Sequence, residues 1–228
     1  MELVRRIVSK IIHQFYGFRA KNISVKGRVL MCHNVGGEKD YFNITTEQFE
    51  EILKRLNRKN VVRLEEWEKQ NDFVCLTFDD VPVSFFLYAY PLLKKYDMPF
   101  TIFVSCSLLD TEGYITTEML KEMADNELCT IGSHGWKHDF FFKFNEKDAR
   151  RDLELSKKQL ESLTGRSVEL YAFPFGSFYA CGLKNKHLVS DYYRYGFGTV
   201  EVPITNPLLL PNYYLPRINV TEENYKDI

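Results

Sequence analysis

The sequence predicts an α/β fold, namely a single domain built as a distorted (β/α)7-type barrel. Seven short apolar runs alternate with segments of helical periodicity along the 228 residues. Each run stays apolar for several residues in succession, as is typical of parallel strands that are buried on both faces. The alternation predicts parallel strands joined by right-handed crossovers. A closed or nearly closed barrel fits this order better than an open sheet, although the order alone is compatible with either.

The seven predicted strands follow one another with helical segments between them. In chain order they span residues 28–33, 73–79, 100–104, 129–133, 170–174, 195–200 and 213–220. We expect residues 25–228 to form the barrel domain, and residues 1–24 to form an amphipathic helical extension that precedes it.

Four helices are predicted between the strands. Thr45 and Gln48 form a capping box at the start of a helix whose apolar residues recur at positions i, i+3, i+4 and i+7. Residues 84–96 and 117–126 show two further helical patterns. The longest helix is predicted over residues 145–163, because Gly165 follows it as a stop signal.

The N-terminal segment has two interpretations. In residues 1–18, apolar residues recur at helical spacing, and Arg5, Arg6 and Lys10 lie on the other side. We favour a helix that caps the domain. The alternative is a basic amphipathic helix that makes peripheral contact with a membrane surface. No apolar run is long enough for a signal peptide or a transmembrane span.

Composition narrows the class of partner and the compartment. The 30 basic and 31 acidic residues give a net charge of −1, so no nucleic-acid partner is expected. The five cysteines are odd in number and show no CxxC spacing, and Cys32, Cys75 and Cys129 lie in apolar runs. We therefore expect reduced thiols and a cytoplasmic location, with membrane association left open.

Ionisable side chains follow the ends of several predicted strands. Asp79 and Asp80 end the second strand, His134 and His138 follow the fourth, and His33 ends the first. Because the carboxyl ends of parallel strands meet at one face of a barrel, we expect these side chains to gather there.

These residue types together predict a metal site. Two adjacent aspartates repel each other unless a positive charge lies beside them. Two histidines four residues apart can face one ion, although an HxxxH pair alone is weak evidence. Asp80, His134 and His138 would form a two-histidine, one-carboxylate site with positions open for water and substrate. We expect one divalent metal ion, zinc by default, with cobalt, nickel or ferrous iron as alternatives.

Three motifs resemble those of the polysaccharide deacetylases, also called carbohydrate esterase family 4 or NodB-homology domains. Residues 76–80 (LTFDD) resemble the TFDD motif, residues 131–138 (IGSHGWKH) resemble the IGSHxxxH metal motif, and residues 172–176 (AFPFG) resemble the third motif. The likeness extends over nearly the whole chain. It implies a distorted β/α barrel, in agreement with the predicted strands.

The resemblance also implies roles for these residues. Asp79 would be the general base, whereas Asp80, His134 and His138 would bind the metal. The peptide N–H near Phe175 would stabilise the developing oxyanion, a task that suits backbone donors because their direction is fixed.

Two departures from the family pattern point to its circularly permuted branch. Many members have an arginine where this chain has Ala172, and a Leu-x-His motif where the last predicted strand has no histidine. Residues 30–35 (LMCHNV) resemble the LMYHxV segment of the permuted branch, in which the N-terminal histidine is the general acid. His33 would then be that acid; the alternative is a buried histidine satisfied by a neighbour. Arg217 would either orient Asp79 in place of the missing arginine or form an ordinary surface ion pair.

Three residues are candidates for substrate contact. They are Trp136, which lies between the metal histidines, and Pro174 and Phe175 of the third motif. The phenylalanines of residues 140–144 are interpreted first as packing residues, and second as a wall on which a sugar stacks.

The expected function is a metal-dependent hydrolase that removes an N-acetyl group from an amino sugar or an N-acetylglucosamine-containing polysaccharide. An alternative keeps the site but changes the substrate to a lipid- or nucleotide-linked sugar, which the enzyme would deacetylate or deformylate. A third interpretation is a non-catalytic carbohydrate-binding relative that keeps only the barrel.

Overall fold

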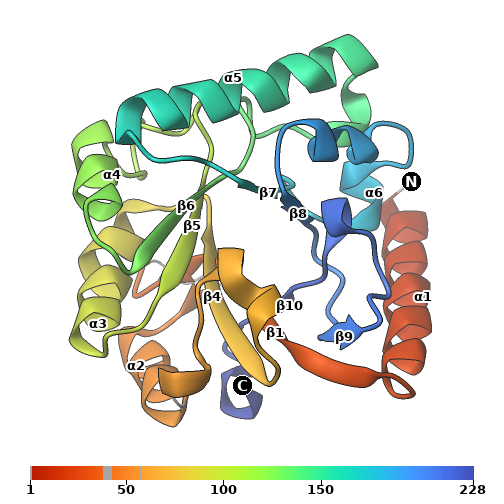
Figure 1. Cartoon of the computed structure of the whole chain (residues 1–228), viewed down its shortest axis with the longest axis horizontal. Helices are drawn as coiled ribbons and strands as arrows, with labels where there is room; N and C mark the ends of the chain where they lie inside the picture. Colours follow the sequence, from red (N-terminus) through yellow and green to blue (C-terminus); the bar gives the residue numbers. More distant parts are fainter. Residues whose placement is uncertain (1, 38–42, 57) are drawn as a thin grey trace.

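The centre of the molecule is a curled parallel sheet. A computed structural model describes residues 2–37, 43–56 and 58–228, and the sheet has the order β10-β1-β4-β5-β6-β7-β8 (Figure 1). Its strands are β1 (Ser24–Cys32), β4 (Phe73–Asp79), β5 (Phe100–Val104), β6 (Cys129–Ser133), β7 (Leu170–Ala172), β8 (Tyr195–Phe197) and β10 (Ile218–Asn219). Each of the seven predicted strands supplies one of them, so the predicted single-domain fold of the distorted β/α barrel type is confirmed.

The register of the strands brings their carboxyl ends to one level. Cys32 lies opposite Phe78 across β1 and β4, Asp79 opposite Phe103 across β4 and β5, and Val104 opposite Ser133 across β5 and β6. The residues that follow these strands therefore meet at the same end of the sheet.

The last predicted strand, residues 213–220, was wrong in extent. Leu215 forms a single parallel bridge with Phe197 of β8, whereas Ile218–Asn219 pairs with β1 on the other side. Pro216 lies between the two pairings and has no N–H to donate, so one continuous strand does not form. The segment instead passes from β8 to β1 and brings the two edges of the sheet together.

The structure also contains three short strands that the sequence did not predict. β9 (Ile204–Asn206) pairs antiparallel with the start of β1. It is three residues long and stands between two prolines, Pro203 and Pro207, which is a pattern typical of a turn. β2 (Asn34–Val35) and β3 (Asn43–Ile44) form a separate two-stranded sheet next to the end of β1.

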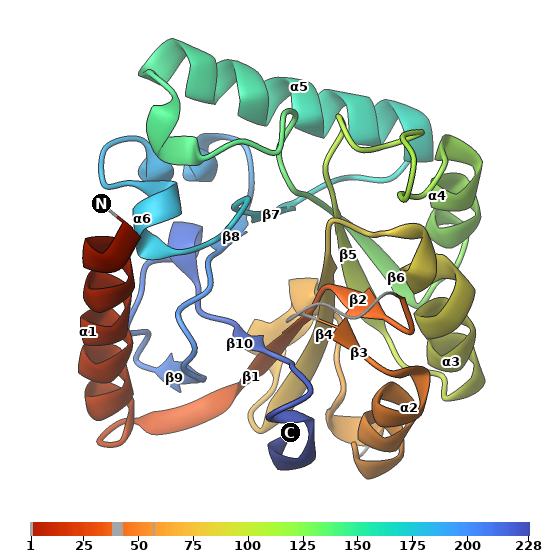
Figure 2. The ribbon, with the colours of Figure 1, turned by 180° about the vertical axis from the view of Figure 1, so that it is seen from behind.

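Helices cover the outer face of the sheet (Figure 2). They are α2 (Thr46–Arg55), a π-helical turn (Phe85–Ala89) that continues into α3 (Tyr90–Lys95), α4 (Thr117–Ala124), α5 (Glu146–Thr164) and α6 (Phe178–Cys181). Short 3-10 turns span Arg58–Asn60, Leu64–Lys69, Phe141–Lys143, Lys186–Asp191, Asn212–Tyr214 and Tyr225–Asp227. The predicted capping box of Thr45 and Gln48 forms at the start of α2, and Gly165 ends α5 at a φ of 65°.

The N-terminal helix α1 (Glu2–Ala20) lies beside α6 at the edge of the molecule (Figures 1 and 2). Ala20 is buried, and Ile12 and Tyr16 pack partly buried against the core. Among the α1 side chains that the structure describes, the exposed large apolar ones are Ile7, Val8, Ile11, Phe15 and Phe18. The helix thus packs on the domain with one face and presents apolar side chains to solvent with another. Within the described residues, no helix is both long and apolar enough to cross a membrane.

The interior of the curled sheet is filled by a cluster of apolar side chains that includes Val29, Cys75, Phe103, Ala172 and Phe197. Such filling makes the barrel interior a packed core and not a pore. All five cysteines are buried and free, as expected for reduced thiols. The residues of the candidate site lie above this apolar layer, at the carboxyl ends of the strands.

Candidate active site

A cavity of about 350 Å³ opens where the parallel strands end. It is lined by Met31, His33, Asp79, Asp80, His134, His138, Phe175, Thr199, Glu201 and Asn219. The structure therefore brings together the predicted base, the predicted acid, the three predicted metal ligands and Phe175, from segments that are far apart in sequence.

The three predicted ligands point at a common position. Asp80 Oδ1 lies 2.8 Å from His138 Nε2 and 3.4 Å from His134 Nε2, and one donor atom from each residue falls within 4.8 Å of the others. Asp80 and Val81 both have positive φ, 61° and 53°, which is unusual for residues other than glycine. This sharp turn directly after β4 directs the Asp80 side chain toward the histidines.

The protonation pattern of His134 fits a metal ligand. Its Nδ1 lies 2.8 Å from the carbonyl oxygen of Ala172, and because a carbonyl only accepts, Nδ1 carries the hydrogen. The lone pair of Nε2 is then free to face the common position, an arrangement typical of metal-binding histidines. Burial also lowers the pKa of His134, which favours the neutral imidazole that a cation requires. The donor set of two imidazoles and one carboxylate fits zinc or a similar divalent ion.

Electrostatics hold the carboxylate ligand in its charged form. Burial opposes the ionisation of Asp80, but the hydrogen bond from His138 and the charges of both histidines outweigh it, and the pKa of Asp80 is lowered. For His138, burial acts to lower the pKa, yet the hydrogen bond and charge of Asp80 raise it overall. A proton on His138 thus occupies the place that a cation would take, so metal binding is expected to release it.

Asp79 is held by a buried arginine from the far end of the chain. Arg217 is 0% exposed, and its Nη1 and Nη2 lie 2.6 and 2.7 Å from the two carboxylate oxygens of Asp79. The Arg217 Nε donates to the carbonyl of Gly198, and the guanidinium lies over the Phe103 ring. Burial opposes the ionisation of Asp79, but the charge of Arg217 outweighs it, and the pKa of Asp79 is lowered. The interpretation of Arg217 as a surface ion pair is therefore wrong.

His33 follows β1 directly and lines the cavity half-buried. β1 lies between β10 and β4 in the sheet, so His33 enters the site from the strand next to the one that ends in Asp79. The two residues proposed to replace the missing family positions thus come from neighbouring segments.

Phe175 lines the cavity with a ring that is 48% exposed. Its backbone has a φ of 60°, and among the described residues its N–H has no hydrogen-bond acceptor. The ring stacks on Phe140 with centroids 4.1 Å apart and contacts His138. Phe140 thus stands next to the site, whereas Phe141 is fully buried in the core.

Two other predicted substrate contacts lie elsewhere. Pro174 is buried and does not line the cavity. Trp136 lines a different cavity of about 320 Å³ against α5, together with Phe144 and Leu155. The cause is the left-handed Gly135, at a φ of 80°, which turns the loop between the histidines toward α5.

Glu201 was missed as a lining residue because nothing in the sequence distinguishes it. It lies in a loop between β8 and β9 and is exposed, as are many glutamates. The place of Phe140 was weakly indicated by the sequence, since it follows His138, the second predicted metal ligand, by two residues.

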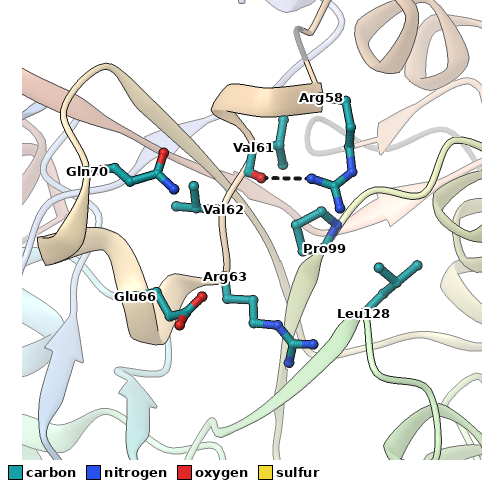
Figure 3. Close-up of a pocket in the computed structure, with 8 residues that line it drawn as sticks. All are labelled: Arg58, Val61, Val62, Arg63, Glu66, Gln70, Pro99 and Leu128. Atoms are coloured by element: carbon teal, nitrogen blue, oxygen red, sulfur yellow. Dashed lines mark hydrogen bonds between the residues drawn. The ribbon is translucent and has the colours of Figure 1, made fainter.

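A further cavity of about 240 Å³ lies at the opposite end of the strands (Figure 3). Pro99 and Leu128, which precede β5 and β6, line it together with Arg58 and Arg63. Both guanidinium groups already have partners: Arg58 pairs with Asp97, and Arg63 donates to the carbonyl of Glu127. This cavity therefore lacks the features of the candidate site.

Comparisons with known proteins agree with this geometry. The chain is 27% identical over 218 aligned positions to the poly-β-1,6-N-acetyl-D-glucosamine N-deacetylase of Staphylococcus aureus. The alignment covers 82% of this chain and 71% of that protein. A polysaccharide deacetylase structure from Bacillus cereus superposes with a TM-score of 0.76 and 24% identity, over 89% of this chain and 68% of that one. IcaB from Ammonifex degensii superposes with a TM-score of 0.73 and 22% identity, over 90% of this chain and 95% of that one.

The family model for polysaccharide deacetylase matches residues 67–197, which is more than half of the chain. The matched segment contains both aspartates, the two predicted histidine ligands and Phe175, whereas His33 and Arg217 lie outside it. On this match, the chain belongs to the polysaccharide deacetylase family.

Proposed function

We propose that this protein is a metal-dependent hydrolase that removes the N-acetyl group from N-acetylglucosamine units of a polysaccharide. The observation that carries the proposal is the convergence of Asp80, His134 and His138 in a cavity that Asp79 and His33 also line. The name of the Staphylococcus aureus relative, a poly-β-1,6-N-acetyl-D-glucosamine N-deacetylase, supports this choice of substrate class.

One divalent metal ion, with zinc as the first choice, would be held by Asp80 Oδ1 and the Nε2 atoms of His134 and His138. Such an ion supplies Lewis-acid polarisation of the acetamide carbonyl and a lowered pKa for water. The remaining chemistry falls to the side chains around it.

Asp79 acts as the general base that takes a proton from the attacking water. Its lowered pKa keeps it ionised at neutral pH, and the two bonds from Arg217 fix the plane of its carboxylate. A base held ionised and oriented in this way needs no rearrangement before it accepts a proton.

His33 acts as the general acid that protonates the departing nitrogen. An amine anion is a very poor leaving group, so the C–N bond breaks only as the nitrogen receives a proton. The N–H of Phe175 donates to the oxyanion that develops on the acetamide oxygen. It is suited to this role because no acceptor for it is found within the part of the chain that the structure describes. The products are acetate and a free amino sugar.

The positions of His33 and Arg217 support assignment to the circularly permuted branch. In this arrangement the acid precedes the matched family segment and the orienting arginine follows it. The absence of an arginine at Ala172 and of a Leu-x-His motif would then be compensated, and the site would be complete.

We also propose that the outer face of α1 makes peripheral contact with a membrane surface. Ile11, Phe15 and Phe18 are 58%, 52% and 70% exposed on a helix that carries several basic residues. An amphipathic helix of this composition binds at the boundary between headgroups and acyl chains.

The direct test is metal analysis of the purified protein combined with measurement of acetate release from β-1,6-linked N-acetylglucosamine oligomers. We expect about one divalent ion per chain and acetate release that a chelator abolishes. Asp79→Asn should abolish turnover and leave the metal bound, whereas His134→Ala should remove both.

A fully active Asp79→Asn variant would refute the assignment of the base. A wild-type protein that binds metal and these oligomers but releases no acetate would instead identify a non-catalytic relative. Release of acetate or formate only from lipid- or nucleotide-linked sugars would change the assigned substrate and leave the assignment of the site residues unchanged.

A further inference from the structure

The loop between the two metal histidines is fixed unequally at its two ends. His134 continues from β6, where its N–H donates to the carbonyl of Val104 and its Nδ1 bonds to Ala172. His138 has a left-handed backbone, at a φ of 51°, and lies beyond the three loop residues Gly135–Lys137. The position of His138 therefore depends on the conformation of this loop.

Asp152 on α5 binds the middle of the loop. Its Oδ2 accepts the N–H of Trp136 at 3.0 Å, and its Oδ1 accepts the N–H of Lys137 at 3.2 Å. Both oxygens are thus used, on two successive peptide groups. The same carboxylate limits the space at Gly135, where a Cβ would lie 3.1 Å from Asp152 Oδ2 and 3.4 Å from the Tyr171 hydroxyl.

The Asp152 carboxylate lies on the buried face of α5, where a charged group does not improve packing. The other buried residues of α5 are Ala149, Leu153, Ser156 and Leu160, and Asp152 is only 7% exposed among them. Burial raises the pKa of Asp152, although the two N–H donors oppose the change. An apolar side chain would fit this face better, so the carboxylate has a use that packing does not explain.

We infer that Asp152 is a positioning residue that fixes His138 in the ligand geometry by holding the Trp136 and Lys137 peptide groups. This inference deepens the proposed function and rests on it. Residues that hold metal ligands from behind commonly change metal affinity or activity 10- to 100-fold when they are replaced.

The test compares Asp152→Asn with Glu154→Gln, which makes the same chemical change at an exposed position of α5. The amide of Asp152→Asn keeps one acceptor oxygen and turns its NH₂ group toward the other loop N–H. We expect its zinc affinity, measured by competition with a chromophoric chelator, to fall about 10- to 100-fold. Glu154→Gln should bind zinc as the wild type does.

Two measurements separate positioning from a general loss of stability. With Co²⁺ in the site, Asp152→Asn should show shifted ligand-field absorption bands, because His138 changes its distance or angle. A purely structural role predicts unchanged bands and only a lower melting temperature. In the wild-type apoprotein, the amide hydrogens of Trp136 and Lys137 should also exchange slowly with solvent.

Wild-type zinc affinity together with unchanged cobalt bands in Asp152→Asn would overturn the inference and leave the proposed function standing. Fast exchange at both loop amides would overturn it without any variant, which covers the case in which Asp152→Asn fails to fold. A wild-type protein that binds no stoichiometric metal would overturn both the proposed function and the role of Asp152.

Discussion

Replacement of Arg217 by methionine tests how Asp79, the proposed base, is kept ionised. Methionine keeps an unbranched apolar chain that can still pack on the Phe103 ring, under the present guanidinium, but it removes every donor. Asp79 is then left 2% exposed without the guanidinium that paired with it. The Thr77 hydroxyl and the Gly198 carbonyl also lose a donor.

The expected loss of stability is large because both members of the pair are buried. Removal of one partner from a buried ion pair costs about 3–5 kcal/mol, since the remaining charge is uncompensated. For a chain of this size, each kcal/mol lowers the melting temperature by about 2–4 °C. The variant should therefore melt about 6–20 °C below the wild type.

The sign of the pH dependence follows from Asp79. In the wild type its pKa lies below the ordinary range, so the pair stabilises the fold at neutral pH and the contribution is lost only as pH falls through the lowered pKa. In Arg217→Met, burial is unopposed by the arginine and the pKa of Asp79 rises. The free-energy difference between the two proteins should be largest at neutral pH and should shrink as the solution is acidified.

The assays are urea unfolding at several pH values and the pH profile of kcat/KM. We expect the acidic limb of the profile to move to higher pH in Arg217→Met, because the base then ionises later. In the double variant Arg217→Met with Asp79→Asn neither position of the former pair carries a charge, so the variant should be more stable than Arg217→Met alone. Unchanged stability together with an unmoved acidic limb would show that Arg217 does not control Asp79.

Three further predictions concern other parts of the molecule. His33→Gln should lower kcat on N-acetyl substrates about 100- to 10,000-fold but should affect hydrolysis of an aryl acetate much less, since a phenolate leaves without protonation; equal losses on both substrates would contradict the role of acid. Phe140→Ala should raise KM for oligomers more than it lowers kcat, because it removes the ring stacked on Phe175 at 4.1 Å; steady-state kinetics with an unchanged KM would exclude a sugar-stacking wall. Replacing Ile11 and Phe15 by glutamine should abolish sedimentation with anionic vesicles and leave the melting temperature within about 1 °C, because surface substitutions have small effects; unaltered vesicle binding would contradict the proposed membrane face.

Local sequence patterns were sufficient to predict most of the strands and helices. The apolar runs located all seven strands of the main sheet, and the capping box at Thr45 and the stop at Gly165 fixed ends of α2 and α5. The strand-end positions of Asp80 and His134 also predicted their meeting, because parallel strands leave no other place for their carboxyl ends.

Features that depend on distant contacts could not be predicted in this way. Asp152 is of a residue type that is usually exposed, although its helix position falls on the inward face beside Ala149 and Leu153. Its use depends on the path of a loop on another element, which local sequence pattern does not predict. Trp136 points to α5 because of the left-handed Gly135, and no periodicity encodes that direction. The break in the last strand has a visible cause in Pro216, but which neighbours the two halves select is decided by closure of the sheet.

The pairing of Arg217 with Asp79 also bears on the proposed compensation for the missing arginine at Ala172. Ala172 belongs to the apolar cluster inside the sheet, together with Phe103, over whose ring the Arg217 guanidinium lies. An arginine at both positions would bring two buried cations to one carboxylate, and the second would be unpaired at a cost of several kcal/mol. A single buried guanidinium balances the charge of Asp79. An arginine at position 172 in β7 or at position 217 before β10 would therefore suffice, and arginines at both positions would leave one of them unpaired. On the proposed function, Ala172 and Arg217 would together leave one buried cation to balance the one buried carboxylate of Asp79.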